Sequence, residues 1–365
     1  MKVNITNSLI VVALIFSLLF YGCSNSTKEL EKKIDRLTAL VEDLEHNHDV
    51  VVKNIDDVQL RLMLEDVAFI DKVRLSGPPR WRAKNKEDRF ASNPLRFFSY
   101  IFIPQNAKEG KKYPLIVLPH GGVHSNFRTN YFGHIVRELI AQGYIVVSPE
   151  YRGSRGYGKS VYQDIDYGGL ENEDVLASRD YMVENYSIVD ENRVGIVGWS
   201  HGGMISLMNI LHYPQKYKVA FAGVPVSDLA NRLTTHDKGY NDYFTAPYHI
   251  GESLEENPQE YKRRSPSNYA HLLKRPLLIY TNTNDEDVHV EEVVVMIDSL
   301  KAHNKEFQYK IFEAMPGGHY FDIMDTNEGS EIRFDIYKFI GEQLNPPYPF
   351  VSFKEMRRIS YRYAK

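Results

Sequence analysis

The stretch 194-VGIVGWSHGGMIS-206 decides the fold, because an apolar run breaks on glycines around one serine and resumes as a small-residue helix pattern. Its centre, Gly198-Trp199-Ser200-His201-Gly202, has the form G-x-S-x-G. A nucleophile on a sharp strand-to-helix turn needs small residues two positions away on each side, since the backbone bends tightly there. We therefore predict that Ser200 is a nucleophile; the alternative is an idle serine in a glycine turn.

A serine hydroxyl reacts only when a histidine takes its proton and an acid orients that histidine. In folds with this turn the acid follows the serine, and the histidine follows the acid. The segment "TNTNDEDVHV" begins where the expected strand 276–283 ends, and it offers three acidic residues. The segment "MPGGHYF" places His319 on a glycine-rich loop after the next strand. We predict that His319 is the base and that an acid of residues 285–287 orients it.

Two backbone N–H groups are expected to stabilise the oxyanion. The His201 imidazole is held to its own turn and cannot serve as the base, but its N–H is well placed as a donor. The loop "LPHGGVHSNF" follows an early strand and supplies the second donor, for which we favour Gly121. We predict that His120, Tyr151 and Trp199 line the substrate pocket.

Continuous apolar runs alternate with helix-period segments between residues 67 and 345. Runs such as 113–119, 144–151 and 276–283 are too uniformly apolar for strands with one solvated face. The alternation indicates an α/β fold, a mostly parallel sheet with helices on both faces. We assign residues 67–345 to one catalytic domain and residues 346–365 to a C-terminal tail that packs on the surface or frays.

The composition is that of a globular protein with one large core: 43% of the 365 residues are apolar and 25% are charged. The net charge of -4, without any basic block, gives no reason to expect a nucleic-acid partner. Cys23 is the only cysteine, which excludes an intramolecular disulfide and a cysteine-rich zinc site. No metal or cofactor is predicted.

The N-terminus is typical of a secreted lipoprotein. A basic start, an apolar run and a small residue before Cys23 indicate a signal peptide at residues 1–22. The Gly22-Cys23 junction resembles a bacterial lipobox, so we expect lipidation of Cys23, a lipidated linker at 23–29 and anchoring in the cell envelope, at the outer membrane. A signal anchor and an ordinary secreted protein are the alternatives.

Residues 30–66 carry a heptad pattern that predicts a coiled-coil stalk. The pattern favours a homo-oligomer, a dimer or trimer, that associates through residues 30–62. If every copy is anchored in the same membrane, the helices of this coiled coil must run parallel. The alternative is a single long helix that packs against its own domain and does not oligomerise. The a and d positions are apolar except for His48. The apolar residues at these positions are Leu30, Ile34, Leu37, Val41, Leu44, Val51, Ile55, Val58 and Leu62.

Several segments together resemble the catalytic domain of the prolyl oligopeptidase family of serine peptidases, over roughly residues 95–343. They include "PHGGVHSNF" (119–127), "PEYRGSRGYGKSVYQ" (149–163), the long segment around Ser200, "NDEDVHVEE" (284–292) and "GGHYF" (317–321). The resemblance implies an α/β-hydrolase fold with Ser200 as nucleophile, Asp285 as acid and His319 as base. It also implies oxyanion donors at His201 and in the His120–Gly121 stretch.

The sequence departs from that family in one large respect. Family members carry a β-propeller ahead of the hydrolase domain, whereas only about 30 residues separate the predicted stalk from the first strand expected here. Relatives without a propeller include carboxylesterases and carbohydrate deacetylases, and the same triad serves esters and amides. We expect a peptidase acting on peptides, with an esterase or deacetylase as the alternative and an inactive envelope scaffold as the third possibility.

Overall fold

The computed structural model describes residues 24–79, 95–235 and 238–361. The predicted signal peptide and Cys23 lie outside these residues. The chain forms two compact units, residues 1–48 and residues 49–365. The boundary between them lies inside the first described helix, α2 (Ser24–Leu64), and the second unit contains the whole sheet.

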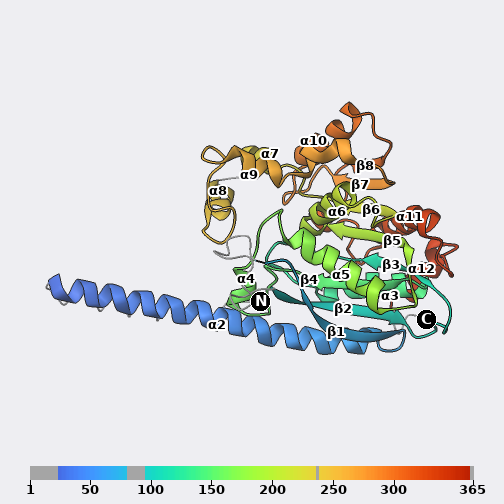
Figure 1. Cartoon of the computed structure of the whole chain (residues 1–365), viewed down its shortest axis with the longest axis horizontal. Helices are drawn as coiled ribbons and strands as arrows, with labels where there is room; N and C mark the ends of the chain where they lie inside the picture. Colours follow the sequence, from blue (N-terminus) through green and yellow to red (C-terminus); the bar gives the residue numbers. More distant parts are fainter. Residues whose placement is uncertain (1–23, 80–94, 236–237, 362–365) are drawn as a thin grey trace. The chain divides into compact units, whose positions relative to one another are not determined.

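An eight-stranded sheet forms the centre of the second unit, in the order β1-β2-β4-β3-β5-β6-β7-β8 (Figure 1). The first two strands are antiparallel to each other and β2 is antiparallel to β4, whereas all later pairs are parallel. This confirms the predicted α/β class with a mostly parallel sheet. The strands are β1 (Ala68–Ser76), β2 (Arg96–Pro104), β3 (Tyr113–Val117), β4 (Ile145–Glu150), β5 (Val189–Trp199), β6 (Val219–Gly223), β7 (Leu277–Asn282) and β8 (Gln308–Phe312).

Helices cover both faces of this sheet, because the parallel strands are apolar on both sides. One hydrophobic core contains side chains of α5 (Glu171–Asn185), α6 (His201–His212) and α10 (Val290–Ala302). The other contains side chains of α3 (Thr129–Ala141), α11 (Asn327–Leu344) and α12 (Phe353–Ile359). Shorter elements complete the unit: α4 (Lys159–Tyr162), α7 (Leu229–Thr235), α8 (Lys238–Thr245), α9 (Pro258–Arg263), η1 (Pro266–Leu272) and η2 (Gly318–Tyr320).

The structure adds one strand to the sequence prediction and shows how the C-terminal tail is held. Strand β1 was not predicted, because it is an edge strand with charged residues in an alternating, half-exposed sequence. In the C-terminal tail, α12 buries Met356 completely and Ser360 bonds to Glu138, so the described part of the tail packs against the domain.

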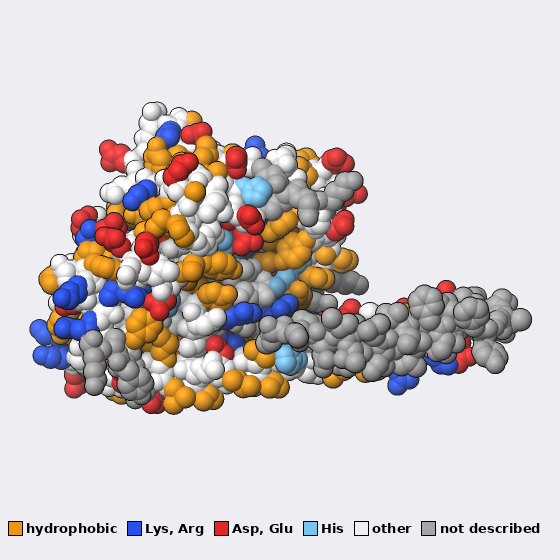
Figure 2. Space-filling view, turned by 180° about the vertical axis from the view of Figure 1, so that it is seen from behind, with side chains coloured by type: hydrophobic (Ala, Val, Ile, Leu, Met, Phe, Trp, Pro, Cys, Tyr) orange, Lys and Arg blue, Asp and Glu red, His pale blue; other side chains and the backbone are white. Residues whose placement is uncertain are grey.

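Helix α2 uses two opposite faces. Within the second unit its residues Lys53, Leu60 and Leu64 are buried against the domain. The predicted a and d positions Val51, Ile55, Val58 and Leu62 are each 55–58% exposed. Figure 2 shows hydrophobic side chains along the lower edge of the large body of the molecule.

In the first unit the a and d residues of α2 are also exposed: Ile34, Leu37, Val41 and Leu44 are 43–66% accessible. We call the exposed apolar residues at the a and d positions the seam: Ile34, Leu37, Val41, Leu44, Val51, Ile55, Val58 and Leu62. Among the described residues, no helix combines the length and the apolar character that crossing a membrane requires.

Candidate active site

Ser200 occupies the strained turn that the sequence predicts. Strand β5 ends at Trp199 and α6 begins at His201, so Ser200 alone joins them. Its φ of 59° and ψ of -122° are values that side-chain-bearing residues rarely adopt. The Ser200 N–H donates to the Gly223 carbonyl at 2.9 Å, and the Ser200 carbonyl accepts from the Met204 N–H at 3.0 Å. The turn therefore holds the hydroxyl at the carboxyl end of the central strand.

The flanking glycines are required by close backbone approach. A Cβ added at Gly198 would lie 2.2 Å from the Gly202 carbonyl oxygen. A Cβ at Gly202 would lie 2.4 Å from the Pro119 carbonyl oxygen. Both distances are far below any real van der Waals contact, so the two glycines of G-x-S-x-G let the turn bend and let the loop after β3 lie directly against it.

Asp285 and His319, the predicted acid and base, are in direct contact. His319 Nδ1 lies 2.7 Å from Asp285 Oδ2. The other carboxylate oxygen of Asp285 accepts the N–H groups of Asp287 and Val288, each at 2.9 Å. Both members are buried, and the loop that carries His319 turns through Gly317 at a φ of 104°. Because the acid occupies Nδ1, Nε2 is the nitrogen of His319 that can take a proton from a serine.

Ser200 and His319 line one cavity of about 260 Å3, together with Gly121 and Trp199. Strand β7 supplies the acid at its carboxyl end, and the segment after β8 supplies the histidine. Carboxyl ends of parallel strands are where ligand sites form in such sheets. The structure thus brings together the three residues predicted as the triad.

The two predicted oxyanion donors belong to segments that adjoin the Ser200 turn. A Cβ at Gly121 would lie 3.0 Å from the Trp199 carbonyl oxygen and 3.4 Å from Ser200 Cβ, so the Gly121 loop runs against the turn. His201 is the first residue of α6, where backbone N–H groups lack intrahelical partners. This is the place from which a helix N-terminus stabilises negative charge.

The His201 side chain has a separate role from its N–H group. Its Nε2 lies 3.2 Å from Glu171 Oε1, and both side chains are buried. Burial alone would raise the pKa of Glu171, but the hydrogen bond and charge of His201 bring that pKa below its usual value. The imidazole therefore faces an acid at the start of α5, away from the base position.

The structure places two of the predicted pocket residues elsewhere. His120 and Tyr151 are both 0% exposed, and the Tyr151 hydroxyl donates to the His120 carbonyl at 2.9 Å. Burial lowers the pKa of His120 to about 3, so its ring is a neutral hydrogen-bonding group. Both residues lie behind the Gly121 loop and support it, because their hydrogen bonds turn them into the interior. We correct their assignment from lining the pocket to supporting this loop.

Trp199 does line the cavity, although its side chain is buried. Its indole Nε1–H donates to Asp322 Oδ2 at 2.7 Å. Burial raises the pKa of Asp322 to about 6, against the opposing effect of the Trp199 hydrogen bond. The contact ties the residue before Ser200 to the segment that follows His319.

A second hollow of about 650 Å3 shares Gly122, Ser125 and Ser200 with the first. Ser200 lies where the two hollows meet. The residues that distinguish the larger hollow include Tyr167, Tyr243, Val226 and His201. Its wall combines these aromatic and apolar groups with charged side chains, Arg128 and Arg232. A concave site of this mixed character is suited to binding part of a substrate next to Ser200.

Arg232 lies between the two hollows and was not singled out from the sequence. Its guanidinium donates to Glu292 Oε2 at 2.8 Å, to the Asp287 carbonyl at 2.8 Å and to the Tyr240 hydroxyl at 2.5 Å. These contacts join α7, α8 and α10 to the acid loop. A lone arginine in a polar, turn-rich stretch gives no local signal of such a position.

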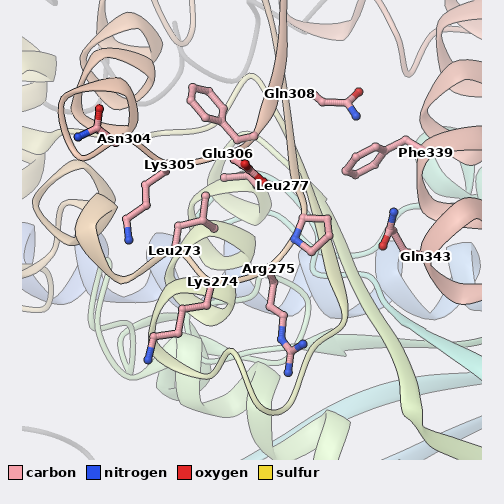
Figure 3. A pocket seen from close by; sticks show the side chains of 12 residues that line it. Leu273, Lys274, Arg275, Leu277, Asn304, Lys305, Glu306, Gln308, Phe339 and Gln343 are labelled. Atoms are coloured by element: carbon pink, nitrogen blue, oxygen red, sulfur yellow. The ribbon is translucent and has the colours of Figure 1, made fainter.

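Another cavity, of about 550 Å3, lies at the opposite end of β7 and is shown in Figure 3. Leu273, Arg275 and Leu277 line it, beside Lys305 and Glu306 from the segment before β8. It lies at the amino end of the strand, whereas Asp285 follows the carboxyl end. This cavity is not part of the candidate active site.

A family model described as the prolyl oligopeptidase family matches residues 130–346, which include Ser200, Asp285 and His319. The chain belongs to the prolyl oligopeptidase family. The resemblance inferred from the motifs is thereby confirmed, and the eight-stranded sheet is the α/β-hydrolase domain of that family.

Two relatives of this prolyl oligopeptidase family member are an uncharacterized peptidase and an acylamino-acid-releasing enzyme. The uncharacterized peptidase YuxL of Bacillus subtilis is 30% identical over 209 residues, covering 57% of this chain and 31% of its own. The acylamino-acid-releasing enzyme of Mus musculus is 28% identical over 225 residues, covering 58% of this chain and 29% of its own. The chain thus spans about a third or less of the length of these relatives.

Solved structures show the same fold. A puromycin-hydrolyzing peptidase of Mycobacterium tuberculosis superposes with a TM-score of 0.64 at 23% identity. The superposition covers 78% of this chain and 41% of that protein. At this identity the likeness supports the architecture of the family domain.

Proposed function

We propose that this protein is a serine peptidase that cleaves peptides through an acyl-enzyme. The observation that carries the proposal is the 2.7 Å contact of His319 with Asp285, in a cavity wall that also holds Ser200 on its strained turn. The peptidase names of the relatives support the choice of peptides over esters. The complete constellation argues against the inactive scaffold.

In the proposed mechanism each of these side chains and N–H groups acts in a defined step of peptide hydrolysis. Ser200 Oγ attacks the substrate carbonyl while His319 Nε2 takes its proton, and Asp285 stabilises the imidazolium that forms. The N–H groups of His201 and Gly121 hold the oxyanion of the tetrahedral intermediate. His319 then protonates the leaving amine, and water, activated by the same histidine, releases the acyl group from Ser200.

The division of the site suggests how a peptide is held. The hollow with Tyr167 and Tyr243 accommodates one apolar or aromatic side chain next to the scissile bond, since it adjoins Ser200 and His201. The smaller hollow, lined by Tyr131 and Tyr320, lies on the His319 side and receives the other part of the peptide. The esterase alternative uses the same triad and differs only in the leaving group.

Parallel assays of peptide anilides and aryl acetates test this function. We expect kcat/KM for the best peptide anilide to exceed that for aryl acetates, with the highest values for apolar or aromatic residues at the cleaved bond. Ser200→Ala serves as the control for contaminating hydrolases. Efficient cleavage of acetates with no turnover of any peptide would replace the peptidase proposal by the esterase.

We further propose that the protein is a lipoprotein of the cell envelope, anchored through Cys23 in the outer membrane, and that it self-associates through the seam of α2. The support for association is that the seam residues of both units are exposed along one side of the helix, where four apolar residues repeat at heptad spacing in each unit. Chains anchored in one membrane would pair in parallel.

Sedimentation of the protein without residues 1–23 tests the association. We expect a dimer or trimer, because a second copy would cover the exposed a and d residues. Leu37→Glu with Leu44→Glu should give a monomer, since charges at d positions oppose seam packing. The matched control, Arg36→Gln with Ala39→Glu, changes the charge equally on exposed positions off the seam and should stay oligomeric. A monomeric unmodified protein would contradict the proposal.

A further inference from the structure

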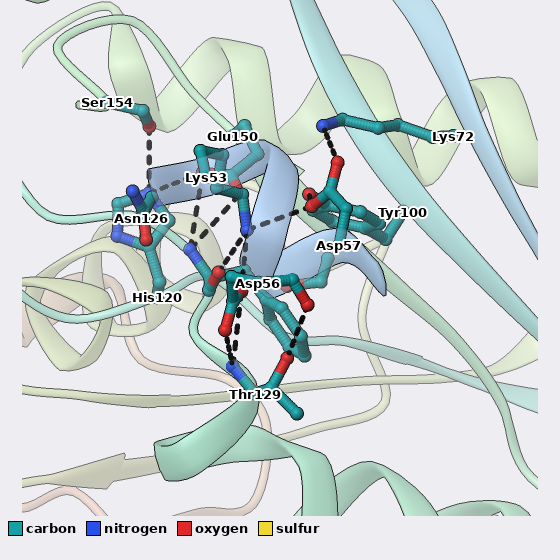
Figure 4. A network of polar contacts seen from close by, with 12 residues as sticks. Lys53, Asp56, Asp57, Lys72, Tyr100, His120, Asn126, Thr129, Glu150 and Ser154 are labelled. Carbon is teal, nitrogen blue, oxygen red and sulfur yellow. Dashed lines mark hydrogen bonds and ion pairs between the residues drawn. The ribbon is translucent and has the colours of Figure 1, made fainter. Parts of the chain in front are cut away.

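Helix α2 contacts the loop that carries the predicted oxyanion donor Gly121. Within the second unit, Lys53 of α2 is 2% exposed, which is rare for a lysine and requires partners. Its Nζ donates to the Phe127 carbonyl at 2.5 Å. Phe127 closes the loop between β3 and α3, the same loop that begins at His120 and Gly121. Figure 4 shows Lys53 of α2 beside Glu150 and Asp56.

The buried ammonium of Lys53 is neutralised by three carboxylates. Asp56 Oδ2 lies at 3.1 Å, Asp57 Oδ1 at 3.4 Å and Glu150 Oε1 at 3.4 Å. Burial disfavours its charge, but these acids more than offset that effect and raise the pKa of Lys53 above its ordinary value. Glu150, at the end of β4, is completely buried and accepts the Phe127 N–H at 3.2 Å.

Glu150 connects this cluster to the residue beside the oxyanion donor. Its Oε2 lies 3.5 Å from His120 Nε2, which is hydrogen-bonded to Ser154 Oγ at 2.8 Å. His120 Nδ1 lies 3.0 Å from the Gly121 carbonyl oxygen. The path from α2 to the oxyanion loop is therefore Lys53, Glu150, His120 and Gly121, with every side chain on it buried.

Asp56 of α2 holds the other end of the same loop. Helix α3 starts at Thr129 without a side-chain cap from its own N-cap residue, Arg128. Asp56 Oδ1 accepts the Thr129 N–H at 3.0 Å, and the Asp56 carbonyl accepts the Thr129 hydroxyl at 3.2 Å. An acidic oxygen at this place satisfies a helix N-terminus, so α2 caps α3 from outside.

We propose that Lys53 and Asp56 of α2 are positioning residues that hold the Gly121 loop in place for oxyanion binding. Neither residue touches substrate; both act through the loop at its Phe127 and Thr129 end. An oxyanion donor works only at hydrogen-bond distance from the developing charge, so a small displacement of Gly121 costs turnover more than substrate binding. The expected change in kcat depends on the proposed serine hydrolase function, whereas the expected change in loop structure does not.

The test uses Lys53→Met combined with Glu150→Gln in the protein without residues 1–23. The double change avoids leaving the Glu150 charge buried without Lys53, which would unfold the domain for unrelated reasons. We expect kcat to fall about 10- to 100-fold, with KM changed less than twofold. Asn54→Ala, at the exposed neighbouring position on the same helix, is the matched control and should retain full activity.

Hydrogen exchange of the same variants gives a readout that needs no activity. We expect residues 119–129 to exchange faster in the double variant, while the buried strand β6 keeps its protection. An unchanged kcat in a folded double variant, or unchanged exchange in residues 119–129, would overturn the positioning role. An inactive wild-type protein whose loop still loosens in the double variant would instead refute the proposed function and leave the positioning role supported.

Discussion

Replacing Ser200 with alanine is expected to lower kcat for peptide hydrolysis by about 10⁴- to 10⁶-fold, because no other group in the site replaces the nucleophile. KM should change little, since the two hollows that hold the peptide remain. Alanine keeps the backbone strain of the turn at its present level, so the melting temperature should stay within a few degrees. Steady-state kinetics with an active-site titration by a fluorophosphonate checks both statements.

Ser178→Ala provides the control for this substitution. Ser178 is also buried, but it lies on α5 and does not line the cavity that contains Ser200. Its hydroxyl contacts the Ser99 hydroxyl at 2.9 Å. We expect it to retain activity and labelling. Residual peptide hydrolysis above one part in a hundred in Ser200→Ala would show that another residue is the nucleophile.

Replacing Asp285 with asparagine is expected to lower kcat by about 10⁴-fold. The reason lies in the contacts of the carboxylate. One oxygen accepts the N–H groups of Asp287 and Val288, so the carbonyl oxygen of an asparagine must take that place. Its NH2 group then faces His319 Nδ1, and the proton of the ring moves to Nε2. An imidazole protonated at Nε2 cannot accept the Ser200 proton.

Glu286→Gln is the matched control, because Glu286 is the exposed acid next in the same loop. It should change kcat less than threefold. Equal losses in the two variants would contradict the assignment of Asp285 as the orienting acid. NMR of the His319 ring nitrogens in the Asp285→Asn variant would show the tautomer directly.

Some parts of the site could be predicted from the sequence because they depend on steric limits within a short segment or on the order of residues along the chain. Gly198 and Gly202 signal the turn because any Cβ there would collide with backbone. The uniformly apolar strands signal burial on both faces, and the order of serine, acid and histidine follows from the order in which the strands reach the same edge of the sheet.

Other features could not be predicted, because they depend on contacts between distant segments. His120 and Tyr151 looked like pocket residues, yet mutual hydrogen bonds turn them inward. In the heptad pattern, Lys53 and Asp56 occupy positions that are usually solvated. The pattern therefore gives no indication that either residue contacts the domain. Their partners in β4 and before α3 lie more than 70 residues away, a distance over which sequence spacing carries no signal.

The burial of Lys53 changes where the catalytic unit begins. A shortened protein starting at residue 67, the first residue of the predicted domain, would keep all eight strands and the triad. It would lose the ammonium group beside Glu150 and the oxygen that satisfies the start of α3. A lone buried carboxylate is costly, so such a fragment would take up a proton, admit water or rearrange behind Gly121. The segment that resembles a tether in the sequence therefore contributes Lys53, Leu60 and Leu64 to the interior of the catalytic unit.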